Sequence, residues 1–171
     1  EYKNRAAFIQ QGSTVDMSVW KEKIQRLPMV TEVLHNYYHP MISKVMMSSK
    51  IAQWEGNEQR LEHPIPMTTF LATEEFFKFY DITLLAGEWL HGLSTKEDII
   101  INESLARKLG WSAEEAIGKH FRNYSGSIEH KIIGVVKDCH YGPPTSKMLN
   151  LAFIADDMTG MCFWNTSVFF K

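Results

Sequence analysis

The sequence has few cysteines and no long apolar run. Cys139 and Cys162 are its two cysteines among 171 residues. Two are too few for a disulfide scaffold, and neither lies in the CxxC pair that a structural zinc site uses. A single disulfide between them is left open by the count. No apolar run approaches the roughly 18 residues that span a bilayer.

The ends of the sequence indicate a fragment. It begins at Glu1 rather than at a methionine, and its last residues, 167–171, have the pattern of a strand rather than a tail. We therefore expect a piece excised from a longer protein, so the lack of signal or membrane segments has no bearing on the parent.

An excess of charge of either sign is also missing. The 18 basic and 20 acidic side chains give a formal charge of -2, and no window of eight residues is strongly basic. A nucleic-acid partner is not expected, because such binders carry a basic patch. Hydrophobic residues make up 44% and charged residues 22%, which argues against general disorder. The length suits one domain or two small lobes.

The sequence lacks the common catalytic and phosphate-binding motifs. Neither GxGxxG nor GxxxxGK[ST] occurs, and Gly118-Lys119 has neither the upstream glycine nor the following Ser or Thr of a Walker loop. Ser104 and Ser112 have no GxSxG frame. We predict no catalytic residue, no cofactor and no metal site.

Two histidine-containing segments are candidates for a metal or catalytic site. His35 and His39 are four residues apart, but a proline follows and no HExxH glutamate is present, which favours an exposed loop. Cys139 and His140 are adjacent, and neighbours on a strand point to opposite faces. A Cys-His catalytic pair needs proximity in space, so the structural interpretation is preferred.

Helical and strand patterns alternate irregularly along the chain. Met17, Trp20, Ile24 and Leu27 lie on one face of a predicted helix over 13–28, which Pro28 ends. Strands are predicted over 29–34, 44–54, 67–72, 99–101, 120–124, 128–136, 149–154 and 167–170. The mixture predicts an α+β fold with mixed sheets and short helices.

Three further short helices have recognisable ends. Thr73 is a predicted N-cap for 74–79, and Asn102 for a helix that ends at Gly110. Ser112 opens a capping box that Gly118 closes. The glutamate pairs at 74–75 and 114–115 are in first helical turns, where acids favour the helix dipole, so we interpret them as caps rather than catalysts.

Four segments in the middle of the chain form an ordered series. They read EFFKFYDITLLAGE (75–88), DIIINESLARKLG (98–110), AIGK (116–119) and IIGVVKD (132–138). The series resembles the MacB-like periplasmic core domain of ABC transporter permeases of the MacB/FtsX type, in a Bacteroidetes-like form. Two positions depart from the family pattern: Glu88 replaces a common Arg, and Cys139 a common Phe.

The matched positions have structural rather than chemical roles. We expect Gly87 to adopt a positive φ at a sharp turn and Gly134 to permit close backbone approach within a strand. None of the matched residues is a nucleophile, a base or a metal ligand. The residues that we single out are Phe76, Phe77, Gly87, Asn102, Glu103, Leu105, Ala106, Gly118, Lys119, Gly134 and Asp138.

The resemblance implies two lobes and a set of partners. Residues 1–64 with 148–171 would form a first, porter-like lobe, and 65–147 a second lobe inserted into it. The domain would lie on the extracytoplasmic (periplasmic) face of the inner membrane, tethered by transmembrane helices of its membrane-embedded parent. Partners would be another permease copy or subunit, a cytoplasmic ATPase acting through the membrane helices, and a periplasmic adaptor or exported substrate.

The implied role is transmission of conformational change during export or lipoprotein handling, without catalysis. A small-ligand sensor domain of a membrane receptor is the alternative, and a deep apolar pocket with convergent polar groups would favour it. An enzyme ranks third and would need a cleft with two or more titratable groups of strongly perturbed pKa.

Overall fold

The computed structural model describes residues 5–11, 22–28, 30–35, 47–57, 62–91, 94–95, 97–123, 128–139, 148–155 and 164–170. The chain divides into two compact units. Unit 1 comprises Glu1–His39 and Asp157–Lys171, and unit 2 comprises Pro40–Asp156.

This division differs from the lobe boundaries expected from the sequence, 64/65 and 147/148. The strands at 47–54 and 151–155, which that expectation assigned to the first lobe, are the two hydrogen-bonded neighbours of the strand at 65–72. Pairing with a common neighbour therefore places both of them in unit 2.

Unit 1 contains a three-stranded antiparallel sheet in the order β1-β10-β2. Its strands are β1 (Arg5–Gln11), β2 (Val30–His35) and β10 (Trp164–Phe170). The sheet joins the two ends of the sequence, because Arg5 pairs with Phe170. At the other end of β10, Thr166 pairs with His35.

The first predicted helix is only partly described. Residues 22–25 are helical and Ile24 is buried, as its pattern predicted. Leu27 was predicted on the same inward face, and that is wrong: it is 47% exposed. The helix has already ended at Leu27, which lies in the turn before Pro28, so helical spacing no longer applies there. Met17 and Trp20 lie outside the described residues.

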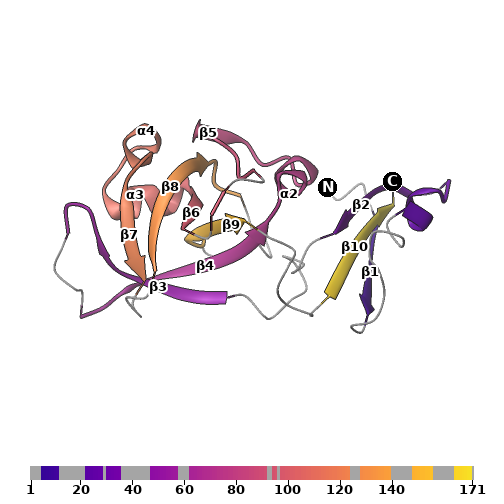
Figure 1. The fold of residues 1–171 in the computed structure, drawn as a ribbon, viewed down its shortest axis with the longest axis horizontal. Helices are drawn as coiled ribbons and strands as arrows, with labels where there is room; N and C mark the ends of the chain where they lie inside the picture. Colours follow the sequence, from indigo (N-terminus) through magenta and orange to yellow (C-terminus); the bar gives the residue numbers. More distant parts are fainter. Residues whose placement is uncertain are drawn as a thin grey trace. The chain divides into compact units, whose positions relative to one another are not determined.

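Unit 2 contains a seven-stranded mixed sheet in the order β5-β8-β6-β9-β4-β3-β7. Its strands are β3 (Met47–Trp54), β4 (Ile65–Ala72), β5 (Leu84–Gly87), β6 (Asp98–Asn102), β7 (His120–Asn123), β8 (Glu129–Val136) and β9 (Leu151–Ala155). β7 also pairs with the first residues of β8, so the sheet closes on itself (Figure 1). β5 pairs with the last residues of β8, on the edge that faces away from β6. Parallel pairs join β4 with β9 and β6 with β8.

The core lies around the central strand β6. Ile99, Ile100 and Ile101 are all fully buried, because β6 has hydrogen-bonded neighbours on both edges and side chains packed on both faces. Leu105 and Phe121 join the same hydrophobic cluster from a helix and from β7.

The short helices of unit 2 begin at the predicted caps. They are α2 (Glu74–Phe79), α3 (Glu103–Leu109) and α4 (Ala113–Ala116), and α3 and α4 lie side by side (Figure 1). The hydroxyls or amides of Thr73, Asn102 and Ser112 accept from backbone N–H groups in the first turns. Gly110 ends α3 with φ 90°.

The predicted α+β class is confirmed, with short strands shifted by one to three residues at their ends. Two described strands differ from the predicted set: β1 was not predicted, and β5 was only implied before Gly87. Ten strands are described, where eight were predicted. His35 is the last residue of β2 rather than a loop residue. His39 lies outside the described residues.

Both ends of unit 2 arrive at one place in its sheet. Met47, the first residue of β3, pairs with Thr69 of β4. Ala155, the last residue of β9, pairs with Ala72 of β4. The start of β3 and the end of β9, from which the chain continues toward unit 1, therefore lie on opposite sides of the last residues of β4, just before α2.

Candidate functional site

The aromatic motif residues lie on α2 and pack onto the sheet. The ring centroids of Phe76 and Phe77 are 5.9 and 5.2 Å from that of Phe153 in β9. Phe153 is also 5.8 Å from Phe70 in β4. These contacts bury α2 against the sheet, and both motif rings are 1% exposed.

The two motif glycines of the strands are direct partners. Gly87 of β5 pairs with Gly134 of β8. A Cβ on Gly87, whose φ is +82°, would lie 2.1 Å from the Ile133 carbonyl oxygen, and one on Gly134 would lie 2.5 Å from the Glu88 oxygen. Both predictions, a positive φ at Gly87 and close approach at Gly134, are confirmed.

Asn102 is fully buried and uses its amide in four directions. Its Oδ1 accepts from Leu105 N at 3.2 Å and from Leu151 N at 2.9 Å. Its Nδ2 donates to Asp138 Oδ1 at 2.7 Å and to Leu149 O at 3.0 Å. One side chain therefore caps α3 and holds the residues on either side of β9's start. The four partners satisfy every donor and acceptor site of the amide, which offsets the cost of removing it from water.

Asp138 extends this network to the surface. Its Oδ1 accepts from Ser104 N at 2.9 Å, and its Oδ2 accepts from Ser104 Oγ at 2.6 Å and from an Arg107 guanidinium nitrogen at 2.9 Å. The structure thus joins two motif segments 36 residues apart. We name Asn102, Ser104, Arg107 and Asp138 the Asn102 network.

The remaining motif residues support this arrangement. Leu105 and Ala106 are buried on the inner side of α3. Glu103 is the first residue of α3 and lies 3.8 Å from an Arg107 guanidinium nitrogen. Gly118 follows α4 with φ +80° and donates its N–H to Ile132 O.

Lys119 takes part in a second polar cluster, at the pairing of β3 with β7. Its Nζ donates to Glu55 Oε2 at 2.8 Å, and Glu55 Oε1 lies 3.1 Å from both the backbone N and ring Nδ1 of His120. Hydrogen bonds from Lys119 first, and then from His120, lower the pKa of Glu55. The carboxylate thereby links the turn after β3 to the first residue of β7.

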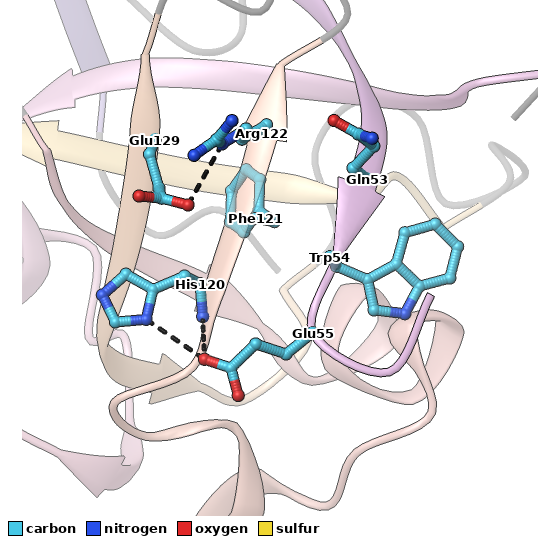
Figure 2. A pocket seen from close by; sticks show the side chains of 7 residues that line it. All are labelled: Gln53, Trp54, Glu55, His120, Phe121, Arg122 and Glu129. Carbon is cyan, nitrogen blue, oxygen red and sulfur yellow. Dashed lines mark hydrogen bonds and ion pairs between the residues drawn. The ribbon is translucent and has the colours of Figure 1, made fainter. Parts of the chain in front are cut away.

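A small open pocket of about 210 Å³ lies beside this cluster. Figure 2 shows the carboxylate of Glu55 at the ring and backbone of His120, and Glu129 at the guanidinium of Arg122, 3.1 Å apart. Its full lining is Gln53, Trp54, Glu55, His120, Phe121, Arg122 and Glu129. The charges are engaged with one another across β3, β7 and β8, so they stabilise the closure of the sheet. This open, charged pocket is not the deep apolar pocket that would favour the interpretation as a sensor domain.

The described residues hold no group of three or more potential metal ligands among His, Cys, Asp and Glu. Within the same part of the chain, no helix is long and apolar enough to cross a membrane. Cys139 is a free, half-buried thiol whose pKa is raised by burial and by Asp138. Cys162, His140 and the acidic pair at 156–157 lie outside the described residues.

Sequence reasoning did not single out several residues that the geometry makes important. Glu55 has no role in the sequence analysis, and Ser104 is named there only for its lack of a GxSxG frame. Arg107 was within a motif without a role, and Phe153 was only part of a strand. Arg107 bonds to Asp138 31 residues away, Glu55 bonds to Lys119 64 residues away, and Phe153 packs on Phe70, which is 83 residues away; no local pattern encodes such contacts.

Comparisons with known proteins agree with this architecture. Residues 3–162 match the family described as MacB-like periplasmic core domain. No curated protein matches the chain.

Three solved structures share the fold. A domain of a protein described as a permease from Porphyromonas gingivalis is 19% identical with a TM-score of 0.61, over 98% of this chain and 74% of that one. The extracellular domain of the noncanonic ABC-type transporter YknZ from Gram-positive bacteria is 14% identical with a TM-score of 0.57, over 96% and 82%. The periplasmic region of MacB from Actinobacillus actinomycetemcomitans is 15% identical with a TM-score of 0.52, over 95% and 66%.

Proposed function

The chain belongs to the MacB-like periplasmic core domains, the extracytoplasmic domains of ABC transporter permeases, and we propose that it transmits displacement between the membrane part of its parent and extracytoplasmic partners. It performs no chemistry itself. ATP hydrolysis takes place in a separate cytoplasmic ATPase domain or subunit. The partners are a second permease copy or subunit and a periplasmic adaptor or exported substrate, in export or lipoprotein handling.

The sheet of unit 1 is the observation that carries this proposal. Its middle strand, β10, is hydrogen-bonded to β1 on one side and to β2 on the other. At one end Arg5 and Phe170 are partners, and at the other end His35 and Thr166 are partners. Arg5 and Phe170 therefore lie side by side at one end of the sheet. His35 and Trp164, from which the chain continues toward unit 2, lie at the opposite end.

Such a sheet is suited to carry displacement along its length. The seven residues of β10 extend about 23 Å. A pull along β10 acts on the ladders to β1 and β2 in parallel, so many hydrogen bonds would have to break together before the strand could slide. A displacement at the Phe170 end would thus arrive at the Trp164 end with little loss.

The polar clusters support a role without catalysis. In the Asn102 network and in the pocket, the carboxylates of Asp138, Glu55 and Glu129 are engaged by donors of this chain. A catalytic acid or base must instead be free to exchange a proton with a substrate. These groups are arranged to hold strands together.

An insertion in the parent permease tests the proposal. Eight Gly and Ser residues placed directly after Phe170 form a flexible coil that interrupts the path into β10. We expect transport to be lost while ATP hydrolysis by the reconstituted complex continues. The measurement is transport and ATPase activity in the same proteoliposomes.

The same insertion after Gly56 is the matched control. Gly56 lies in the turn after β3, away from the path through unit 1, and nothing lies within 4 Å of where its Cβ would be. Transport should survive there. Full transport with the insertion after Phe170 would overturn the proposed function.

A further inference from the structure

We propose that Asn102 is the joint through which β9 passes displacement to the surface helix α3, so that it acts as a positioning residue in the coupling path. This inference rests on the proposed function and adds a route within unit 2. The route begins where β9 ends toward unit 1 and finishes at the first turn of α3.

The first step is the attachment of β9. Displacement from unit 1 can enter unit 2 only along the chain at β3 and β9 or by contact between the units. Within the sheet, Ala155 at the end of β9 pairs with Ala72, and Met47 at the start of β3 pairs with Thr69. Of the two strands, β9 is the more deeply buried, because Leu151, Ala152 and Phe153 are at most 1% exposed whereas Lys50 of β3 is exposed.

The second step is the opposite end of β9, which side chains hold from both sides. On the β6 side, Asn102 accepts from Leu151 N and donates to Leu149 O. On the β4 side, Asn150 Nδ2 donates to Pro66 O at 2.7 Å, and Asn150 O accepts from Thr68 N at 2.8 Å. Sliding of β9 along its axis would therefore have to break these bonds as well as the ladder.

The third step connects this anchor to α3. The same Asn102 Oδ1 that accepts from Leu151 N also accepts from Leu105 N in the first turn of α3. Its Nδ2 holds Asp138, which in turn binds Ser104 and Arg107. Because Asn102 is 0% exposed, bulk water does not reach its amide to replace the bonds that the amide itself makes.

The consequence is a short mechanical link. When β9 shifts, Asn102 must move with it or lose bonds, and α3 begins at the next residue. Arg107 and Lys108 of α3 are exposed, so a shift of this helix changes the surface of unit 2. A cap that only stabilised α3 would need none of the bonds to residues 149 and 151.

The substitution Asn102→Ser separates the two roles. Serine is a good N-cap, so the bond to Leu105 N is retained, whereas its shorter side chain does not reach Leu149 or Leu151. We expect the Leu151 amide and the rest of β9 to exchange hydrogen on the order of a hundredfold faster, because three of the four Asn102 bonds are lost. Exchange in α3 should stay within about twofold. In the parent permease, transport should fall while ATP hydrolysis continues.

Ser112→Ala is the matched control. It also removes a side-chain cap from a short helix, α4, whose cap contacts are confined to residues 112–115. It should leave exchange in β9 and transport unchanged. Equal acceleration of all protected amides by Asn102→Ser would show general destabilisation and overturn the joint.

A second variant covers failure of the first to fold. Asn102→Asp keeps the Oδ1 acceptor and loses the donor to Leu149 O. It also places a second carboxylate beside that of Asp138. Relative to the wild type at the same pH, exchange in β9 should then be accelerated more at high pH, where the introduced carboxyl is charged, than at low pH; a ratio to the wild type that does not change with pH would overturn the joint. If the insertion after Phe170 abolishes transport and Asn102→Ser does not, the joint is wrong and the proposed function stands.

Discussion

Replacement of Gly87 by alanine tests how closely β5 approaches β8. Gly87 has φ +82°, and an added Cβ would lie 2.1 Å from Ile133 O, 2.7 Å from the Ile117 Cδ1 and 2.9 Å from the Gly134 Cα. Two of these three atoms belong to backbone, so they cannot rotate away as a flexible side chain would. Gly110 is the matched control, with φ +90° and nothing within 4 Å.

The difference between the two sites separates strain from overlap. A left-handed conformation costs a residue with a Cβ about 1–2 kcal/mol, and the reduced entropy of the unfolded chain returns about 0.4–1 kcal/mol. Gly110→Ala should therefore destabilise by about 1 kcal/mol. At Gly87 the overlap adds about 1–3 kcal/mol. Separating the strands would also weaken the bond from Glu88 N to Ile133 O, worth about 1 kcal/mol.

We expect Gly87→Ala to lower the free energy of unfolding by about 3–5 kcal/mol in total. Urea denaturation followed by circular dichroism measures it, provided that the slope with denaturant is unchanged from the wild type. Equal losses for Gly87→Ala and Gly110→Ala would refute the reasoning, because φ alone would then explain both. Near-wild-type stability of Gly87→Ala would show that β5 does not approach β8 so closely.

Three further outcomes are expected. Asn102→Ala should cost about 3–5 kcal/mol, since four hydrogen bonds of about 1 kcal/mol each are lost; Ser112→Ala, an exposed cap, should cost about 0.5–2 kcal/mol. Equal urea midpoints for the two would contradict this. The pKa of Glu55 is lower in the folded state, so its contribution to stability is present above its unfolded value of about 4.5 and is lost as pH falls through the folded pKa. Glu55→Gln should therefore destabilise at pH 7 and converge with the wild type as the pH falls below the folded pKa of Glu55, which unfolding titrations at a series of pH values from 7 downward measure. Calorimetric titration of the isolated domain with millimolar Mg-ATP should give no saturable heat, and binding that a single pocket substitution abolishes would favour a sensor or an enzyme.

Local chemistry explains why the helix caps and the fold class could be predicted from the sequence alone. Thr73, Asn102 and Ser112 could be identified as caps because a cap bonds to a backbone N–H within three residues. Gly110 could be placed because a helix commonly ends in a left-handed residue. The α+β class followed from strand and helix patterns that are equally local. The family resemblance rested on an ordered series of such segments.

Local patterns failed to predict the residues at which a helix or a strand ends. Leu27 was expected inside because helical spacing was extended past the point where the helix ends. His35 was expected in a loop because the strand was ended one residue early. In each case the end of the element, rather than its type, was misjudged, and ends depend on partners outside the segment.

Which distant residues meet depends on how the strands are ordered in the folded chain. Asn102 was predictable as a cap, but its bonds to Leu149, Leu151 and Asp138 depend on β6 lying between β8 and β9. The closure of the sheet through β7 likewise brings Glu55 to Lys119, 64 residues away. Strand order is selected by the summed packing of all strands, which no short segment encodes. The helix caps, the two closely packed glycines and the fold class could therefore be predicted from the sequence, whereas it is the three-dimensional path of the chain that makes a helix cap also hold the start of β9.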